Sequence, residues 1–306
     1  MLAPLGTLYG LSVRARQARA HPFRPNALVL CVGNLTAGGS GKTPIAMTLA
    51  RILMARRHKV VFLTRGYRGR LHGPVAVDPH KHSAVDVGDE ALLLASVAPT
   101  VIARDRARGA ALADSLRANV ILMDDGFQNF QLAKDVSLVV IDSETGFGNG
   151  RLIPAGPLRE PVEQGLARAD AVVLMGEAPL QSLPFTGPIL RAELHPTAPE
   201  RFMGRSVFAI AGIGRPEKFF RTLAAMGASV VGTRAFPDHH RYSLVDIQAV
   251  KQIAASAGAL LVTTEKDFVR IEANRRDGIL PVPVHAVFAD DPKLGVMLDR
   301  LAMARA

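Results

Sequence analysis

A glycine-rich segment near the N-terminus carries the residues with the clearest chemistry in this chain. It directly follows an apolar run, 27–32, and opens a stretch with helical periodicity. A strand, a glycine-rich loop and a helix that begins with Lys-Thr bind nucleoside triphosphates, because backbone N–H groups and the helix N-terminus converge on the phosphates. Lys42 would reach the β- and γ-phosphates, and the Thr43 hydroxyl would bind Mg²⁺. The predicted nucleotide-binding residues are Thr36, Gly38, Gly39, Ser40, Gly41, Lys42 and Thr43.

This segment departs at one position from the strict phosphate-loop pattern, G-x-x-x-x-G-K-[ST]. Thr36 stands where the pattern requires glycine, so only the core at 38–43 remains. That core is typical of a divergent subgroup of P-loop proteins, whose frequent signature lysine is replaced here by Ala37. The alternative is a glycine-rich turn that binds no ligand. Strand, loop, Lys-Thr pair and helix all agree, which favours the nucleotide site.

Two pairs of carboxylates are candidates for the metal and for general-base catalysis. Asp124 and Asp125 end an apolar strand predicted at 120–123. In P-loop folds a carboxylate at this place holds Mg²⁺ or its water, although such acids also cap turns. Asp89 and Glu90 follow a glycine and begin an apolar helical run. Spacing alone favours Asp89 as a simple N-cap over a general base paired with a metal-directed acid.

Histidine and arginine residues complete the set of candidates. Asp238-His239-His240 follows a predicted strand in the C-terminal part of the chain. Two adjacent histidines point in different directions and form a poor chelate, but one histidine in a cleft could orient a carboxylate base. Arg106 and Arg159 could hold anionic substrate groups, although each alone is typical of a solvated surface charge.

Alternating strands and helices are predicted to position these residues. The pattern predicts an α/β fold of the P-loop type with a mostly parallel sheet, a second α/β unit in which the pattern restarts, and an N-terminal amphipathic helix. The predicted domains are 1–25, 26–200 and 201–306. The predicted strands are 27–35, 59–64, 100–103, 120–123, 137–141, 171–175, 189–194, 207–213, 230–234, 260–264 and 282–287. The predicted helices are 43–57, 89–98, 106–117, 217–226, 244–255, 267–273 and 293–304.

Composition excludes several classes of protein. The chain has 306 residues, 48% of them hydrophobic, which is ample for a core. One cysteine, Cys31, excludes an internal disulfide and a cysteine-based zinc site. The net charge is +10, but the arginines are scattered and aromatics are few, which favours phosphate ligands or a membrane surface over nucleic acid. The segment 263–267 superficially resembles a guanine-reading motif in the wrong register, which argues against a GTPase.

The first 25 residues have the order of an interfacial helix. Apolar residues at 2–13 precede arginines at 14–24, which reverses the order of a signal peptide. The chain contains no run of about 18 apolar residues, so the sequence predicts no transmembrane helix. The residues by themselves leave two alternatives open: a helix at a membrane surface, or an ordinary amphipathic helix packed on the domain.

Taken together, these motifs resemble the tetraacyldisaccharide 4′-kinase family, which phosphorylates a lipid A precursor. The likeness covers nearly the whole chain. The matching stretches are Val32-Gly33-Asn34-Leu35-Thr36, Gly38-Gly39-Ser40-Gly41-Lys42-Thr43-Pro44, Arg65-Gly66-Tyr67, Gly88-Asp89-Glu90, Asp124-Asp125-Gly126-Phe127-Gln128, Phe147-Gly148-Asn149-Gly150, Pro154-Ala155-Gly156-Pro157-Leu158-Arg159-Glu160, Ala211-Gly212-Ile213-Gly214, Asp238-His239 and Thr264-Glu265-Lys266-Asp267.

The resemblance implies a reaction and a subcellular location. It implies ATP and Mg²⁺, and transfer of the γ-phosphoryl group to the 4′-hydroxyl of a lipid A disaccharide 1-phosphate. The implied partners are this glycolipid and the inner-membrane surface of a Gram-negative bacterium, on its cytoplasmic face. Neither nucleic acid nor an obligate protein partner is expected. The resemblance also implies two three-layer α/β/α lobes, the second one smaller, and favours the interfacial alternative for the N-terminal helix.

Roles for individual residues follow from the same resemblance. Asp89 matches the family's proposed base, and His239 matches the histidine that pairs with it. The matching phosphate-binding and metal-linked positions are Lys42, Thr43, Glu90, Asp124 and Asp125, and the arginines implicated in activity are Arg106 and Arg159. Asn129 replaces the family's usual histidine and Arg68 its usual glycine, which affects the expected acceptor pocket and not the expected reaction.

A rival hypothesis is a P-loop ATPase switch that recruits a protein partner at the membrane. It would explain the divergent loop and the basic N-terminus. It has no need of Asp89, His239 or the Pro-rich segment 154–160. A switch should hydrolyse ATP without lipid, whereas a kinase should do so only slowly.

Overall fold

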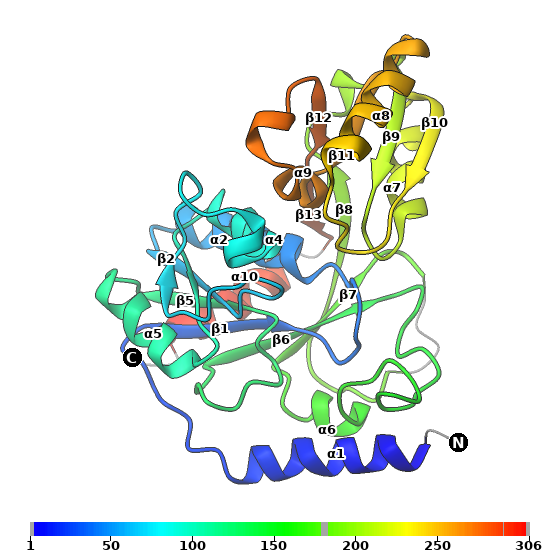
Figure 1. Ribbon diagram of the computed structural model, residues 1–306. Coiled ribbons are helices and arrows are strands. Elements are labelled where there is room, and N and C mark those ends of the chain that lie inside the picture. The colour runs from blue at the N-terminus through cyan, green and yellow to red at the C-terminus, as the bar shows by residue number, and fades with distance from the viewer. Residues whose placement is uncertain (1–2, 179–182, 290, 304–306) are drawn as a thin grey trace.

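Two sheets of unequal size organise the chain, one in each of two lobes (Figure 1). The computed structural model describes residues 3–178, 183–289 and 291–303. The chain passes between the lobes twice, through residues 197–205 and at Pro283.

The larger lobe is built on a nine-stranded sheet. Its seven inner strands are parallel to their neighbours, and the edge strands β3 and β13 are antiparallel. Four central strands, β5, β6, β7 and β2, are buried along their whole length, as expected for strands covered on both faces. In spatial order the strands are β13 (Val284–Phe288), β8 (Ile189–Pro196), β7 (Ala171–Met175), β6 (Val136–Asp142), β1 (Leu28–Gly33), β5 (Val120–Asp124), β2 (Val60–Thr64), β4 (Thr100–Ile102) and β3 (Val75–Ala76).

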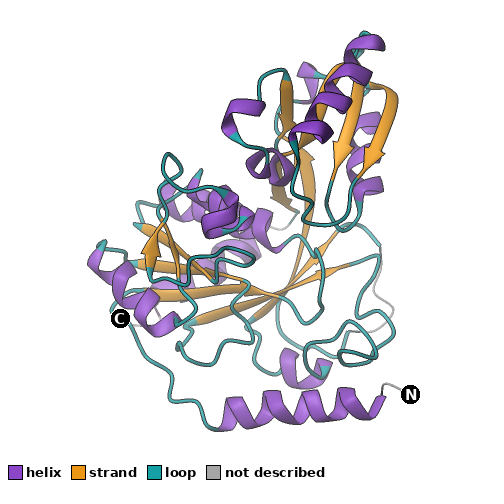
Figure 2. Cartoon of the chain, in the orientation of Figure 1, coloured by secondary structure: helices purple, strands orange, loops and turns teal. Residues whose placement is uncertain are grey.

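Helices cover both faces of this sheet (Figure 2). One core, which includes Leu49, Leu94 and Leu298, lies under α2 (Lys42–Ala55), α4 (Asp89–Ala95) and α10 (Asp291–Met303). The opposite core, which includes Ala110 and Leu166, lies under α5 (Arg106–Ser115) and α6 (Val162–Leu166). The short helix α3 (Ala84–Val87) precedes α4, and α1 (Ala3–Ala18) runs along the outside of the α6 layer (Figure 1).

The smaller lobe repeats the three layers on a four-stranded parallel sheet. The strands lie in the order β10 (Ser229–Ala235), β9 (Ser206–Ala211), β11 (Leu260–Thr264) and β12 (Ile279–Val282). Helix α7 (Pro216–Ala225) packs on one face, and α8 (Leu244–Ser256) and α9 (Glu265–Arg270) pack on the other. Two 3₁₀ turns, η1 (Pro199–Arg201) and η2 (Ala273–Arg275), lie in connections. The architecture matches the predicted pair of α/β/α lobes.

The C-terminal strand and helix return to the larger lobe, which differs from the predicted division at residue 201. One strand was predicted at 282–287, but Pro283 separates β12, in the small sheet, from β13, which pairs with β8 in the large sheet. Ala286 and Phe288 then enter the large core together with α10. Proline donates no ladder hydrogen bond, so it marks the change of sheet.

The N-terminal helix forms as predicted but is not clearly amphipathic. Leu5, Leu8 and Leu11 are 51%, 63% and 52% exposed. The protein-facing side is instead made by small residues: a Cβ at Gly6 would lie 3.2 Å from the Leu152 oxygen, and one at Gly10 only 2.8 Å from Leu152 Cδ1. The helix therefore packs through glycine. Within the part of the chain that the structure describes, no helix is both long and apolar enough to cross a membrane.

Candidate active site

The glycine-rich loop lies at the carboxyl end of β1, in the middle of the large sheet, and leads directly into α2. Gly38 and Gly41 have φ values of 116° and 84°, which non-glycine residues rarely adopt. The Ala37 N–H donates to the Pro157 oxygen at 2.7 Å, which ties the loop to the neighbouring segment. A Cβ at Gly38 or Gly39 would meet no atom within 4 Å. The outer side of the loop is therefore open to a ligand.

Asp124, at the end of β5, lies beneath this loop. Its Oδ2 accepts a hydrogen bond of 2.9 Å from Thr43 Oγ1, and its Oδ1 is buried with no hydrogen-bond partner. Burial raises the pKa of Asp124, and the negative charges of Glu90 and Asp125 raise it further. A buried carboxylate oxygen that lacks a donor, among other acids, has the chemistry that suits a bound cation.

The donors around Asp124 fit Mg²⁺ as the cation. Mg²⁺ commonly takes one or two carboxylates together with waters and substrate phosphates. Among residues 3–178, 183–289 and 291–303, no cluster of three or more His, Cys, Asp or Glu side chains could hold a metal. The oxygens of Thr43 and Asp124 would therefore bind Mg²⁺ together with waters and the phosphates of a nucleotide. They do not form a complete metal site made of protein ligands alone.

Asp125 has cationic partners, unlike Asp124. Its Oδ1 lies 3.6 Å from Lys42 Nζ and 2.7 Å from Arg159 NH1. Burial alone would raise the pKa of Asp125, but the charges of Lys42 and Arg159 outweigh burial and lower that pKa. Asp125 has φ 53°, the left-handed region, so the turn after β5 directs it away from its neighbour. The two adjacent acids thus differ in their surroundings.

Asp89 meets His239 across the two lobes, as predicted. His239 Nδ1 lies 3.1 Å from Asp89 Oδ2, and Arg270 Nε donates to the same oxygen at 2.6 Å. Burial would raise the pKa of Asp89, which is 4% exposed, but the hydrogen bond from His239 and the charges of Lys266 and Arg270 hold that pKa well below its usual range. Asp89 is also the first residue of α4, and its Oδ1 accepts from the Glu90 N–H at 2.9 Å.

Arg270 and Lys266 are functional candidates that the sequence analysis missed. Lys266 Nζ lies 3.2 Å from Glu90 Oε1, so Glu90 already has a cationic partner. Both basic residues lie on α9, one helical turn apart and directly after β11. The available signal was the i, i+4 spacing of Arg270 from Lys266, which lies in the stretch Thr264-Glu265-Lys266-Asp267 that matches the family.

Arg106 is a buried cation at the start of α5. It is 3% exposed, its guanidinium donates to the Ala103 oxygen, and its Nε has no partner in the described structure. Burial lowers the pKa of Arg106 to about 10, and the nearby charge of Arg65 lowers it too. The Arg106 N–H lies 3.3 Å from Gln131 Oε1, which also accepts from Asn129, one of the two departures from the family pattern.

The other departure, Arg68, occupies a conformation that suits glycine. Its φ is 61°, and its guanidinium lies 5.7 Å from the centre of the Tyr67 ring. Glycine adopts positive φ without a steric penalty, so the backbone here suits the glycine that the resemblance led us to expect. The Tyr67 ring in turn meets the His239 ring edge-on at 5.6 Å, so this loop borders the Asp89 site.

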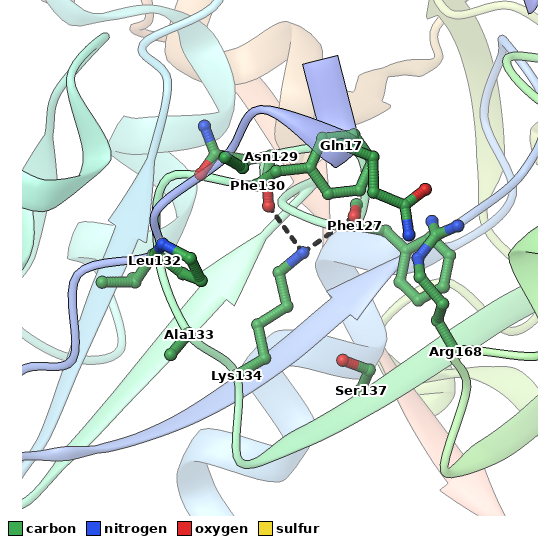
Figure 3. Close-up of a pocket in the computed structure, with 11 residues that line it drawn as sticks. Gln17, Phe127, Asn129, Phe130, Leu132, Ala133, Lys134, Ser137 and Arg168 are labelled. Atoms are coloured by element: carbon green, nitrogen blue, oxygen red, sulfur yellow. Dashed lines mark hydrogen bonds between the residues drawn. The ribbon is translucent and has the colours of Figure 1, made fainter. Parts of the chain in front are cut away.

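A pocket of about 280 Å³ opens beside the loop that follows Asp125 (Figure 3). Lys134 points into its centre and donates to the Phe127 and Asn129 oxygens at 2.8 and 2.7 Å. The Arg168 guanidinium lies 4.8 Å from the centre of the Phe127 ring and pairs with Glu160. These contacts fix the loop that carries Gln128, whose Nε2 donates to the Asn34 oxygen at 2.7 Å.

Fold and site together define a P-loop nucleotide-binding enzyme whose carboxylate–histidine pair is assembled between two lobes. Comparison with known proteins narrows this class. The family model described as tetraacyldisaccharide-1-P 4′-kinase matches residues 1–302. The chain belongs to the tetraacyldisaccharide 4′-kinase family, as predicted.

Curated relatives and a solved structure agree with this membership. The tetraacyldisaccharide 4′-kinase of Parvibaculum lavamentivorans is 48% identical over 324 residues, covering 100% of this chain and 93% of the relative. That of Rhodospirillum rubrum is 49% identical over 316 residues, covering 100% and 95%. The crystal structure of LpxK from Aquifex aeolicus in complex with ATP superposes with a TM-score of 0.79 at 28% identity, covering 98% of both chains. The predicted fold and the predicted enzyme class, a kinase with an alcohol acceptor, are confirmed.

Proposed function

We propose that this chain transfers the γ-phosphoryl group of ATP to the 4′-hydroxyl of a tetraacyldisaccharide 1-phosphate, a step of lipid A biosynthesis. One observation carries the proposal beyond family membership. The phosphate loop contacts Asp124 through Thr43, and the charge of Glu90, the neighbour of Asp89 in the Asp89–His239 pair, acts on the same Asp124. A phosphoryl donor and a base for the acceptor hydroxyl are both needed for this transfer.

The phosphate loop would bind the nucleotide. The backbone of residues 38–43 would face the phosphates, and Lys42 would exchange its contact with Asp125 for contacts to them. Thr43 and Asp124 would hold Mg²⁺, with Asp125 and Glu90 nearby but already paired with basic side chains. Bound there, Mg²⁺ would neutralise charge that develops on the transferring group.

Asp89 would act as the general base. As the acceptor oxygen bonds to the γ-phosphorus and the bond to the β,γ-bridging oxygen breaks, the hydroxyl proton moves to Asp89 and ADP leaves. His239, supplied by the second lobe, would orient the carboxylate. The buried Arg106 and the partly exposed Arg159 would counter the negative charge of the substrates.

We further propose that α1 binds the cytoplasmic face of the inner membrane. The exposed leucines at 5, 8 and 11 supply an apolar surface, and the exposed Arg14, Arg16 and Arg19 suit anionic lipid head groups. The glycolipid acceptor resides in a membrane, so a peripheral helix would bring the enzyme to its substrate.

Transfer of labelled γ-phosphate from ATP to tetraacyldisaccharide 1-phosphate in detergent micelles tests the reaction. We expect labelled lipid from the unmodified chain. Thr43→Ala should lower the rate about 100-fold or more, the scale of losing one electrostatic contact to the reacting group. Thr222→Ala is a matched control, because this hydroxyl bonds within α7 to the Lys218 oxygen.

The opposite result is equally clear. Brisk release of free phosphate without labelled lipid would overturn the kinase proposal and favour an ATPase switch. Equal transfer rates for Thr43→Ala and Thr222→Ala would show that Thr43 of the phosphate loop takes no part in phosphoryl transfer.

A further inference from the structure

Arg270 joins the two lobes through the two edges of one guanidinium group. It is the last residue of α9, and its side chain is 5% exposed. One edge is anchored in its own lobe, where NH1 donates to the Gly212 oxygen at 2.5 Å and to Asp267 Oδ1 at 2.9 Å. A planar guanidinium presents its donors in a fixed fork, so anchoring one edge also sets the direction of the other.

The anchor of Arg270 is itself rigid. Asp267 is fully buried, and its Oδ2 accepts from the Gly212 N–H at 3.1 Å and from Thr264 Oγ1 at 2.7 Å. The Gly212 oxygen also accepts from the His239 N–H at 3.0 Å. The second lobe therefore holds Arg270 and His239 in one hydrogen-bonded unit, independent of contacts to the first lobe.

The other edge of the Arg270 guanidinium contacts Asp89 in the first lobe. Arg270 Nε and NH2 lie 2.6 and 2.5 Å from Asp89 Oδ2, and His239 Nδ1 lies 3.1 Å from the same atom. Asp89 Oδ1 accepts only a backbone N–H, that of Glu90, among the interactions of the described residues. The rotation of the carboxylate is thereby fixed, with Oδ2 turned to the second lobe.

Arg270 and Asp89 compete for the same ring nitrogen of His239. Arg270 NH2 lies 3.3 Å from His239 Nδ1, which itself lies 3.1 Å from Asp89 Oδ2. One ring nitrogen cannot both donate to Asp89 and accept from Arg270.

We propose that Arg270 is a positioning residue for phosphoryl transfer. It holds Asp89 through Oδ2 so that Oδ1 remains for the acceptor hydroxyl, and it makes this arrangement depend on docking of the second lobe. The inference rests on the proposed role of Asp89 as base. Lys266, one turn earlier on α9, pairs with Glu90, so one helix of the second lobe contacts both acids at the start of α4.

Arg270→Lys tests this role. Lysine keeps the positive charge but lacks the planar guanidinium whose two edges contact both lobes at once. We expect kcat to fall about 100-fold, the cost of a reacting group misplaced by about 1 Å, with KM for ATP changed less than about twofold. Arg275→Lys is the matched control, because the Arg275 guanidinium pairs with Glu272 in the second lobe. A kcat equal to that of the control would overturn the inference.

Chemical rescue separates positioning from folding. Arg270→Ala leaves two buried carboxylates without their cation, and added guanidinium ion should restore part of kcat in this variant and none in Asp89→Ala. The positioning role of Arg270 would be overturned if guanidinium ion failed to restore kcat in folded Arg270→Ala. It would also be overturned if guanidinium ion raised kcat equally in Arg275→Ala. If Asp89→Ala keeps the parent kcat, the base assignment fails; if only Arg270 variants keep it, the positioning role alone fails.

Discussion

Four acids of the site differ in what each carboxylate contacts, and these contacts set their roles. Asp89 and Glu90 are held by Arg270 and Lys266, and Asp125 by Lys42 and Arg159. Asp124 is fully buried with an oxygen that no described donor reaches. A buried charge without a partner costs stability, so its retention points to a ligand.

This difference predicts the behaviour of Asp124→Asn. The substitution removes a buried charge, keeps the size, and leaves an oxygen to accept from Thr43. We expect the free energy of unfolding without nucleotide and Mg²⁺ to rise by about 1 kcal/mol, while phosphoryl transfer falls about 100-fold. Urea denaturation and the labelled-phosphate assay measure the two effects.

A surface substitution supplies the reference for this experiment. Asp277→Asn makes the same chemical change at an exposed position in the second lobe and should alter neither quantity. If Asp124→Asn is less stable than the parent and equally active, the cation-site interpretation is wrong.

Among the elements, α1 differs from the other helices in how it packs. Its contact with the body of the protein uses Gly6, Gly10 and the buried Val13, so its leucines remain exposed. An apolar surface of this kind on an outer helix is typical of a membrane-binding element. Helix α10, on the opposite face of the large sheet, instead buries Leu294, Met297 and Leu298 in the large core.

Replacing Leu5, Leu8 and Leu11 together by serine should weaken binding to vesicles that contain anionic lipid. Each leucine is about half exposed, so the loss should reach at least 10-fold in the partition coefficient at the usual value of buried apolar surface. Thermal stability should change little. Cosedimentation with vesicles measures binding, and Val245→Ser, which is 74% exposed on α8, is the control. Unchanged partitioning would exclude α1 as the membrane element.

At the scale of the whole molecule, two groups of ion pairs join the lobes. Besides the contacts of Asp89, Asp142 at the end of β6 pairs with Arg215 and Lys218 of the second lobe. Burial would raise the pKa of Asp142, but hydrogen bonds from Arg215 and Lys218 and their charges lower it to about 2. The orientation of the lobes, and with it the distance between His239 and the phosphate loop, depends on both groups.

The sign of this shift predicts a pH dependence. A carboxyl whose pKa is lowered on folding stabilises the folded protein above its unfolded pKa of about 4, and the effect is lost as pH falls through about 2. We expect Asp142→Asn to lower the free energy of unfolding at pH 7 by about 1 kcal/mol, a figure discounted because both basic partners are one third exposed. Below pH 2 the variant and parent should converge.

Urea denaturation at several pH values measures this dependence. Glu272→Gln, which removes an exposed pair within the second lobe, should have a much smaller effect at every pH. The difference in free energy of unfolding between Asp142→Asn and the parent should disappear below about pH 2. A difference that persists there, or grows as pH falls, would contradict the assignment of Asp142 to an interlobe ion pair.

The sequence by itself determined the phosphate loop, most strands and the family. These features depend on contiguous residues: the loop needs glycines and Lys-Thr between a strand and a helix, and buried strands need apolar runs. Asp124 and Asp125 were predicted as site residues because they end a buried strand, whereas spacing alone left Asp89 as a helix N-cap and only the resemblance to the family made it a candidate base.

Only the tertiary structure decided which acid has a free oxygen, where β13 and α10 belong and which side of α1 is buried. Arg270 and Asp89 lie 181 positions apart, and no local pattern encodes their contact. Such contacts depend on how two separately folded sheets dock, and a short strand such as β13 can extend either sheet edge with the same local sequence. Spacing along the chain predicts the elements, but partners across lobes follow from packing.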